Sequence, residues 1–258
     1  MLSTNAPWSL NGQTILVTGG TMGIGEAVVQ EAARLGATVL VLARNQNRLA
    51  EKLEAWRGSG FPVKGLSIDL SGRSGVEQAL DWIRKEAPVL HGVVNNVGTN
   101  IRKKSVDYTE DEVEYLLRTN LLSGFHLIRQ LVPNLRASGS GSVVNVASVG
   151  GLRALRSGAP YAMTKAAMIQ MTRNLAVEWA SDQIRVNSVA PWYTRTPLAS
   201  PVLEQPEVLA DILSRTPMKR IAEPVEVARA VVFCLMPASS YMTGHCLVVD
   251  GGFMAYGF

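Results

Sequence analysis

The sequence predicts a single doubly wound α/β domain built on a mostly parallel sheet of seven strands. Three observations favour this fold. Strand-like and helical segments alternate along the whole chain, a glycine-rich turn joins the first strand to the first helix, and no linker, repeat or low-complexity tract divides the 258 residues. Strands that alternate with helices need crossovers, and the crossover helices cover both faces of a parallel sheet. We therefore expect one domain over residues 1–258.

The predicted elements follow one another in the order that this fold requires. Short apolar segments predict strands at Gln13–Val17, Thr38–Leu42, Val63–Ile68, Gly92–Asn95, Ser142–Val146, Arg185–Val189 and Cys246–Val249. Apolar residues at helical spacing predict helices at Ala27–Leu35, Asn45–Trp56, Val76–Lys85, Asp111–Leu135, Gly158–Trp179 and Val225–Leu235. The alternation breaks after Pro191, where Pro197, Pro201 and Pro206 oppose any regular element. Such an irregular insertion is usually functional, so we expect a substrate lid at about residues 192–216.

Composition excludes several classes of protein. Lys and Arg number 25 against 21 Asp and Glu, and this net charge of +4 is too diffuse to predict nucleic-acid binding. Residues 1–10 lack a secretory signal, and no apolar stretch of about 18 residues predicts a membrane span. Cys234 and Cys246 lie among apolar residues, which favours buried free thiols and a reducing, cytoplasmic compartment. The three histidines lack ligand-spaced partners, so we expect no metal site.

A glycine-rich turn follows the first predicted strand, and a helix begins directly after it. The turn reads Thr18-Gly19-Gly20-Thr21-Met22-Gly23-Ile24-Gly25, with the spacing Gly-x-x-x-Gly-x-Gly. Glycines let the backbone approach a pyrophosphate closely, while the N–H groups and the positive end of the following helix attract its charge. The turn therefore predicts a bound dinucleotide, and the alternative is a glycine-rich turn without a ligand.

The end of the second predicted strand indicates which dinucleotide is bound. In NAD-binding folds an acidic residue about 20 residues after the turn holds the ribose 2′-hydroxyl. Here the sequence reads Leu42-Ala43-Arg44-Asn45, without a carboxylate. A guanidinium pairs with a 2′-phosphate, so Arg44 favours NADP(H). The alternative is that Arg44 is an ordinary exposed residue at the start of a helix.

Tyr161 and Lys165 lie four residues apart in a predicted helix, so their side chains share one face. A nearby ammonium stabilises phenolate and lowers the pKa of a tyrosine toward neutrality, as a general acid requires. This spacing alone also arises by chance. Ser148 follows a predicted strand, where its hydroxyl can hold a substrate carbonyl, although a serine there is often only a turn residue. Together the three residues predict reduction of a carbonyl, with Tyr161 as the proton donor.

These residues resemble the short-chain dehydrogenase/reductases, and the resemblance runs from about Leu10 to Phe258. Besides the glycine turn and the Tyr161–Lys165 pair, it is carried by Asp69, Asn95-Asn96-Val97-Gly98, Asn120 and Ser148. The family implies a Rossmann-type fold and hydride transfer from a nicotinamide cofactor. It also implies a homo-oligomer, a tetramer or a dimer, with contacts through the Tyr-Lys helix and the long helix before it.

The resemblance implies a role for each matching residue. Tyr161 donates the proton, Lys165 lowers its pKa and binds the nicotinamide ribose, Ser148 orients the carbonyl, and Asn120 holds a water in the proton relay. The residues expected to contact the cofactor are Gly19, Thr21, Met22, Gly23, Ile24, Gly25, Arg44, Asn45, Asp69, Leu70, Asn96, Val97, Gly98, Tyr161, Lys165, Pro191, Tyr193 and Thr196. Those expected to contact the substrate are Ser148, Leu155, Tyr161 and Trp192.

Two positions depart from the common pattern of the family. Val97 stands where many members have alanine, and Trp192 stands where many have glycine, so a bulky indole must occupy space near the substrate. Within the family, residues 95–103, 175–180 and 185–192 resemble the tropinone-reductase-like group. The members of that group differ in substrate, so the resemblance does not imply tropinone itself.

The substrate pocket is expected to be mostly apolar. Its predicted lining is Val149, Leu152, Ala154, Leu155, Trp192, Tyr193 and parts of the lid at residues 198–213. Such a lining favours a small or medium, mostly apolar ketone over a polyanion or a sugar. Arg153 and Arg156 are the exceptions, which either face solvent or bind a substrate carboxylate.

Two other functions stay open. Arg102 and Lys103 lie near the predicted pocket mouth, where they could bind the acidic face of a carrier protein. The chain would then be a 3-oxoacyl-[acyl-carrier-protein] reductase. The other alternative is a non-catalytic dinucleotide sensor, against which the intact catalytic residues argue.

Overall fold

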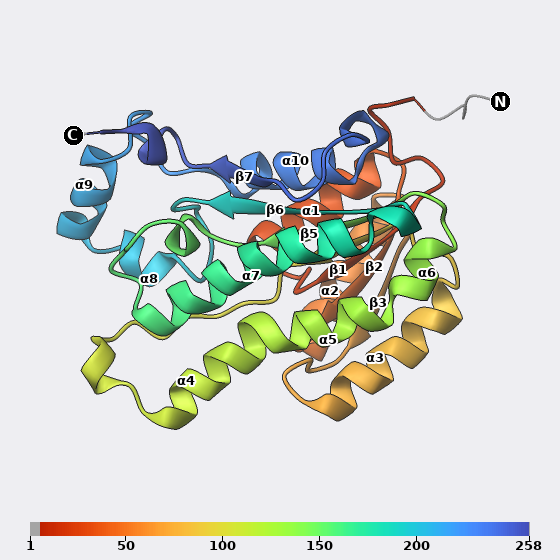
Figure 1. The fold of residues 1–258 in the computed structure, drawn as a ribbon, viewed down its shortest axis with the longest axis horizontal. Helices are drawn as coiled ribbons and strands as arrows, with labels where there is room; N and C mark the ends of the chain where they lie inside the picture. Colours follow the sequence, from red (N-terminus) through yellow and green to blue (C-terminus); the bar gives the residue numbers. More distant parts are fainter. Residues whose placement is uncertain (1–5, 258) are drawn as a thin grey trace.

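The computed structural model describes residues 6–257, in which seven strands form one parallel sheet (Figure 1). The strands are β1 (Thr14–Thr18), β2 (Thr38–Ala43), β3 (Val63–Ser67), β4 (Gly92–Asn95), β5 (Gly141–Val146), β6 (Ile184–Pro191) and β7 (Cys246–Val249). Their order across the sheet is β3-β2-β1-β4-β5-β6-β7, which confirms the predicted doubly wound fold. The strands β4 and β5 are buried along their whole length, and they read as apolar runs rather than as alternating residues.

Helices connect the strands and cover both faces of the sheet. The α-helices are α1 (Gly23–Arg34), α2 (Gln46–Gly58), α3 (Arg73–Glu86), α4 (Glu110–Leu117), α5 (Ser123–Gln130), α6 (Val132–Arg136), α7 (Ala159–Glu178), α8 (Ser200–Leu203), α9 (Pro206–Ser214) and α10 (Pro224–Leu235). Single 3-10 turns lie at Ser105–Asp107, Val149–Gly151, Ala180–Asp182, Pro237–Ser239 and Phe253–Ala255. Buried residues of α1, α2 and α10 form one apolar core, and those of α3, α5 and α7 form a second core.

The strand order creates the crevice in which the site lies. From β1 the chain continues outward through β2 and β3, and from β4 it continues outward in the opposite direction. The loops after β1 and β4 therefore diverge at the carboxyl ends of two neighbouring strands, which is where ligands bind in open α/β sheets.

The long helix predicted between Asp111 and Leu135 is not one regular helix. The structure has α4, a π-helical turn at Arg118–Leu122 and α5 in direct succession, and then the separate α6. Pro133 lies in the first turn of α6 and has no N–H with which to continue a helix, so the preceding helix ends before it. The π-helical turn is the more informative deviation, because such turns often occur at functional sites and this one carries Asn120.

The predicted lid contains regular structure, so the expectation of an irregular segment is wrong. Pro201 and Pro206 lie in the first turns of α8 and α9, where a missing N–H breaks no hydrogen bond. Prolines that seemed to oppose helices therefore begin them. The segment also packs on a small apolar cluster of its own, centred on Val202, Ile212 and Ile221.

The structure tests only some of the expectations that were drawn from composition. No helix within residues 6–257 is both long and apolar enough to cross a membrane. The expectation about a secretory signal falls partly on residues 1–5, which lie outside the described residues. Cys234 is buried, Cys246 is half-buried, and both are free thiols. Burial raises the pKa of the Cys234 thiol to about 12.

Candidate active site

The glycine turn after β1 places the N-terminus of α1 at the crevice. Gly19 and Gly23 have φ values of +66° and +55°, which side chains rarely adopt, so glycine is needed at both positions. Gly25 is needed for a different reason, because a Cβ there would stand 2.2 Å from the Gly19 carbonyl oxygen. The turn and the first turn of α1 are thus in direct backbone contact.

The loop after β4 is fastened to this turn by side chains. Thr18 Oγ1 accepts hydrogen bonds from the backbone N–H groups of Asn96 (3.0 Å) and Val97 (3.2 Å). Asn96 Nδ2 donates to the carbonyl oxygens of Thr18 (3.0 Å) and Gly19 (3.2 Å). The two loops that diverge from β1 and β4 are therefore held as one unit, and they form the floor of a cavity.

This cavity has a volume of about 580 Å³ and runs along the carboxyl ends of the strands on the β1 side of the sheet. Of the residues predicted to contact the cofactor, those that line it are Gly19, Thr21, Met22, Gly23, Ile24, Arg44, Asn45, Asp69, Leu70, Asn96, Val97, Gly98 and Thr196. Gly25 and Lys165 lie outside its lining, while Tyr161, Pro191 and Tyr193 line a second cavity instead. The lining residues that the sequence analysis missed are Leu42, Ala43, Arg48, Ile68, Ser71, Thr119, Pro197 and Leu198.

Two arginines stand at the β2 end of the cavity. Arg44 follows β2, and Arg48 lies in the first turn of α2, which Asn45 caps by accepting a hydrogen bond from the Arg48 N–H (2.9 Å). Among residues 6–257, neither guanidinium forms an ion pair. The sequence analysis did not predict Arg48. This residue lies three positions after Asn45 in the helix, and this spacing places it on the same helix face as Asn45, next to the cavity.

The cavity fits a dinucleotide by its chemistry as well as by its position. The N-terminus of α1 supplies free N–H groups for a pyrophosphate, and the two arginines supply charge for a further phosphate. Thr119 lines the cavity and is buried, yet its Oγ1 has no hydrogen-bond partner among the described residues. A buried hydroxyl without a partner costs stability unless a ligand satisfies it. The residues present are therefore those that a bound NAD(P) needs.

Tyr161 and Lys165 lie on the first half of α7, as predicted; Lys165 is buried, and Tyr161 is half-buried. Lys165 Nζ lies 5.8 Å from the centre of the Tyr161 ring and donates a hydrogen bond to the Val146 carbonyl (2.8 Å). Ser148 caps the 3-10 turn after β5, and its Oγ accepts a hydrogen bond from the Gly150 N–H (3.0 Å). Accepting that bond leaves the hydroxyl proton of Ser148 free to be donated to a substrate oxygen.

Asn120 fastens the loop after β4 to the π-helical turn. Its Oδ1 accepts a hydrogen bond from the Thr99 N–H (2.8 Å), and its Nδ2 donates to the Thr99 carbonyl (2.9 Å). The same amide lies 3.3 Å from Thr164 Oγ1 on α7. Both the oxygen and the nitrogen of the amide thus form hydrogen bonds. Asn120 therefore links the π-helical turn to the loop after β4 and to α7. Its role in a proton relay stays a prediction.

The electrostatics around Tyr161 differ from the simple expectation. Burial raises the pKa of Tyr161, and the Ser148 hydroxyl and the charge of Arg102 act against this rise. The Lys165 ammonium donates its hydrogen bond to Val146, and burial lowers the pKa of Lys165 to about 8. That Lys165 lowers the pKa of Tyr161 stays a prediction.

The second cavity, of about 110 Å³, lies where a substrate would meet Tyr161, and we call it the substrate cavity. Its lining is Ile24, Asn100, Arg102, Ser148, Val149, Leu155, Ser157, Tyr161, Pro191, Trp192, Tyr193, Thr194, Thr196, Leu198 and Ala199. The predicted Leu155 and Trp192 are among these residues, whereas Leu152 and Ala154 line only a wider groove outside it. Most of these residues are apolar, and polar side chains such as Asn100, Arg102 and Ser157 stand among them.

Trp192 is a fixed wall of the substrate cavity. Its Nε1 donates a hydrogen bond to Thr216 Oγ1 (3.0 Å), and its ring stacks on Phe253 with centroids 3.8 Å apart. The Tyr193 ring meets it edge-on at 4.7 Å. Thr216 and Phe253 lie far along the chain from Trp192, so no local pattern could have predicted their part in the site.

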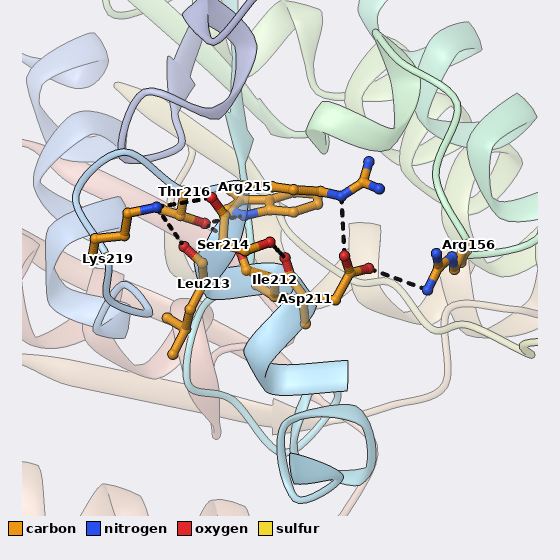
Figure 2. Close-up of polar contacts among 9 residues, drawn as sticks. Arg156, Asp211, Ile212, Leu213, Ser214, Arg215, Thr216 and Lys219 are labelled. Atoms are coloured by element: carbon orange, nitrogen blue, oxygen red, sulfur yellow. Dashed lines mark hydrogen bonds and ion pairs between the residues drawn. The ribbon is translucent and has the colours of Figure 1, made fainter. Parts of the chain in front are cut away.

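An ion pair fastens helix α9 to the loop before α7. Figure 2 shows Asp211 between two arginines: Arg156 of that loop at 3.2 Å and Arg215, directly after α9, at 3.2 Å. At the end of α9, Lys219 Nζ donates to the carbonyl oxygens of Leu213 and Ser214, which satisfies groups that a helix end leaves free. Arg156 therefore faces solvent with a partner of its own.

Comparison with known proteins agrees with this geometry. The family model described as "Enoyl-(Acyl carrier protein) reductase" matches residues 18–254. A tropinone reductase homolog of Arabidopsis thaliana is 48% identical over 261 residues, which cover 100% of this chain and 98% of that protein. The chain belongs to the short-chain dehydrogenase/reductase family.

Two further members of the family are similar over most of the chain. A second Arabidopsis thaliana tropinone reductase homolog, described as chloroplastic, is 47% identical over 100% of this chain and 80% of its own length. The crystal structure of a putative NAD(P)-dependent gluconate 5-dehydrogenase from Beutenbergia cavernae, with NADP bound at low occupancy, is 32% identical and has a TM-score of 0.93. That likeness covers 97% of this chain and 100% of the other. This short-chain dehydrogenase/reductase is therefore an NAD(P)-dependent oxidoreductase.

The two departures from the common pattern of short-chain dehydrogenase/reductases have different consequences. Val97 lines the cofactor cavity and packs against the core beneath α3, α5 and α7, so the larger side chain fills space without closing the crevice. Trp192 closes one side of the substrate cavity. The departure at Trp192 therefore changes the wall of the substrate cavity, whereas the one at Val97 changes the lining of the cofactor cavity.

Proposed function

We propose that this protein reduces the carbonyl of a small or medium ketone to an alcohol, with NADPH as the hydride donor and Tyr161 as the general acid. The observation that carries the proposal is the junction of the two cavities. Ile24, Thr196 and Leu198 line both cavities, and Tyr161 and Ser148 stand in the substrate cavity next to this junction. A nicotinamide at the junction would lie between the cofactor site and the proton donor.

The chain supplies orientation and a proton. NADPH, when bound, supplies the hydride that forms the new C–H bond at the carbonyl carbon. Ser148 donates a hydrogen bond to the carbonyl oxygen, and Tyr161 transfers its phenolic proton to that oxygen as negative charge develops there. Lys165 binds beside Tyr161 and stabilises the phenolate that remains. Each buried side chain is held by its own contacts, so little motion is needed at the moment of transfer.

Arg44 and Arg48 support NADPH rather than NADH as the cofactor. Both line the cofactor cavity at the β2 end, where the adenine-side ribose would lie, and no carboxylate stands beside them at the end of β2. Two guanidinium groups favour a 2′-phosphate, and nothing at the end of β2 would repel one.

The test is substitution of the proton donor with a matched control in the same cavity. Tyr161→Phe is expected to lower kcat for NADPH-dependent ketone reduction at least about a hundredfold, because the general acid is lost. Tyr193→Phe removes a hydroxyl from the same cavity and is expected to retain most activity. Calorimetry should give similar Kd values for NADPH in both variants. A Tyr161→Phe enzyme with more than about a tenth of the original rate would contradict the assignment.

A second candidate, 3-oxoacyl-[acyl-carrier-protein] reduction, is favoured by the groove outside the substrate cavity. The lining of this groove of about 950 Å³ includes Arg102, Lys103, Lys104, Arg153 and Arg156, and within residues 6–257 it includes no carboxylate. A basic surface of this kind attracts an acidic partner. The kcat/KM for a 3-oxoacyl thioester on carrier protein, compared with that for a cyclic ketone, decides between the two functions. A higher value for the carrier-bound substrate would favour the second.

We further propose that the chain forms a homo-oligomer in the cytoplasm. The support is an exposed apolar surface on the side of α4, the π-helical turn and α7, which lie side by side (Figure 1). Tyr115, Leu122, Met163 and Val177 are exposed there, and Val177 is 82% exposed. Light scattering coupled to size exclusion should give the mass of a dimer or tetramer, and a monomer would contradict the proposal. Imaging of a tagged chain tests the compartment, because one relative is described as chloroplastic.

A further inference from the structure

The substrate cavity contains one charged side chain, and it is a cation. Arg102, in the loop after β4, is the only charged residue among those that line this cavity. The rest are apolar side chains, hydroxyls and one amide. Arg102 also lines the outer groove, so it stands at the passage between the cavity and solvent.

The neighbouring cations divide into those with a partner and those without. Lys103 pairs with Glu112 (2.5 Å), and Arg156 pairs with Asp211 (3.2 Å). Arg102 forms no ion pair or hydrogen bond with any of residues 6–257. Lys104 is likewise without an ion pair among the described residues, but it lines only the outer groove. Among residues 6–257, Arg102 is thus the cation that lines the substrate cavity and has no ion pair.

A buried hydroxyl without a partner lies in the same cavity. Ser157 is only 8% exposed, and its Oγ has no hydrogen-bond partner among the described residues. A Cβ on Gly150 would stand 3.3 Å from Ser148 Oγ and 3.6 Å from Ser157 Oγ, so the two hydroxyls flank one backbone position. The Ser157 backbone is held by a hydrogen bond from Asn100 Nδ2 to its carbonyl (3.0 Å). Ser148 has a task in the proposed reaction, whereas Ser157 has none.

We propose that the ketone reduced at this site carries a carboxylate, and that Arg102 and Ser157 bind that carboxylate while Ser148 and Tyr161 act on the carbonyl. This inference rests on the proposed function and specifies its substrate class as oxo acids. A carboxylate accepts hydrogen bonds from both a guanidinium and a hydroxyl, and charge-assisted bonds of this kind are stronger than neutral ones. Asn100 Oδ1, also without a partner, is an acceptor and adds no affinity for the carboxylate.

The size of the cavity limits the spacing between the two oxygen groups. A cavity of about 110 Å³ is small, so it encloses only the reacting end of a substrate. The carboxylate and the carbonyl must then be separated by few carbons, as in 2-oxo and 4-oxo acids. A longer apolar tail would extend past Arg102 into the outer groove.

The test compares each oxo acid with its neutral methyl ester. The probes are 2-oxobutanoate and 4-oxopentanoate, and the quantity measured is the ratio of kcat/KM for the acid to kcat/KM for the ester. We expect the enzyme to favour at least one acid, and Arg102→Gln to lower that ratio about tenfold, since a hydrogen bond to a charged group contributes on the order of 1.5 kcal/mol. An effect of Arg102 on the pKa of Tyr161 acts on both substrates and cancels in the ratio.

Three further variants separate binding of the carboxylate from a general effect of charge. Lys104→Gln removes a charge of the same sign two residues away, and it should leave the ratio unchanged. Arg102→Lys keeps the charge and should retain part of the preference. Ser157→Ala should lower the ratio about threefold, because it removes one donor. Equal kcat/KM for acids and esters in the unmodified enzyme, or an equal loss in Arg102→Gln and Lys104→Gln, would overturn the proposal.

A binding measurement keeps this inference distinct from the proposed function. With NADP⁺ bound, 2-hydroxybutanoate should bind more tightly than its methyl ester by calorimetry, and Arg102→Gln should remove the difference. This readout needs no turnover. Absence of any carbonyl reduction would overturn the proposed function alone, whereas equal affinity for the hydroxy acid and its ester would overturn the carboxylate site alone.

Discussion

The cofactor cavity is built around a close backbone contact in the glycine turn, whereas the substrate cavity is walled by side chains from distant segments. A Cβ on Gly25 would stand 2.2 Å from the Gly19 carbonyl oxygen, and the side chains of Thr18 and Asn96 fasten the loop after β4 to this turn. The wall of the substrate cavity depends on the Trp192–Thr216 hydrogen bond, and the exposed Arg156–Asp211 ion pair lies outside its lining. The first region has little freedom to change its shape, and the second can change its lining one side chain at a time. The two regions should therefore respond very differently to substitution.

The largest effect is expected where a side chain enters the close backbone contact in the glycine turn. In Gly25→Ala the new Cβ would stand 2.2 Å from the Gly19 carbonyl oxygen and 2.5 Å from Asn96 Nδ2, so the turn must move. We expect the Kd for NADPH to rise at least about a hundredfold and the free energy of unfolding to fall by about 2 kcal/mol. Fluorescence titration and urea denaturation measure the two quantities.

Gly58→Ala is the matched control for this substitution. Gly58 ends α2, and a Cβ there meets nothing within 4 Å. Alanine should leave NADPH binding unchanged and stabilise the helix slightly. An equal Kd for NADPH in Gly25→Ala and Gly58→Ala would show that the glycine turn accepts a side chain without loss of NADPH binding. The expected difference between the two cavities would then be wrong.

The next largest effect is expected for the two arginines at the edge of the cofactor cavity, Arg44 and Arg48, and it concerns the preference for NADPH over NADH. Arg44→Ser and Arg48→Ser should each lower the ratio of kcat/KM for NADPH to kcat/KM for NADH about tenfold, because each removes a charge-assisted bond to the 2′-phosphate. Arg57→Ser, at the other end of α2 and outside the cavity, is the control. If NADH is already preferred by the unmodified enzyme, the assignment of NADPH is wrong.

The same contrast explains how much the sequence could predict. The glycine turn, the strands and the pair of Tyr161 and Lys165 all lie within short segments whose spacing determines their geometry, and the structure places them as predicted. Thr119 and Arg48 were missed although they lie on elements that were predicted. Which face of a helix turns toward a cavity depends on packing against the rest of the molecule, and a π-helical turn shifts that face at Thr119.

The substrate side was predicted less well for a physical reason. Thr216 and Phe253 reach Trp192 only because β6, α9 and the C-terminal turn meet in space. Pro201 and Pro206 were interpreted as residues that prevent a helix. A proline disrupts a helix when it lies in the interior, but these two lie in the first turns of α8 and α9, where proline is tolerated. The partner of Arg156 could not be assigned either, because Asp211 approaches Arg156 from a distant segment.

A third prediction concerns the buried ammonium between the two cavities. Burial lowers the pKa of Lys165 from 10.5 to about 8, so the folded state binds fewer protons than the unfolded state between these two pH values. Stability should therefore rise with pH across this window, by on the order of 1 kcal/mol between about pH 7 and pH 9. Urea denaturation at the two pH values measures the rise. Lys165→Met should remove it, and the exposed Lys85→Met should keep it. A rise that persists in Lys165→Met would assign it to another group.

The smallest effect is expected at the Arg156–Asp211 ion pair, where Arg156 lines the groove outside the substrate cavity. The Arg156 side chain is 80% exposed and that of Asp211 is 38% exposed, so their attraction is weakened by water and by salt. Arg156→Gln frees the loop before α7 from α9 and should raise the KM for a ketone no more than about threefold, with a smaller effect at high salt. Arg215→Gln breaks only the contact within α9 and should leave the KM unchanged. A much larger rise in KM for Arg156→Gln, insensitive to salt, would mean that the mouth of the substrate cavity is held as rigidly as the cofactor cavity.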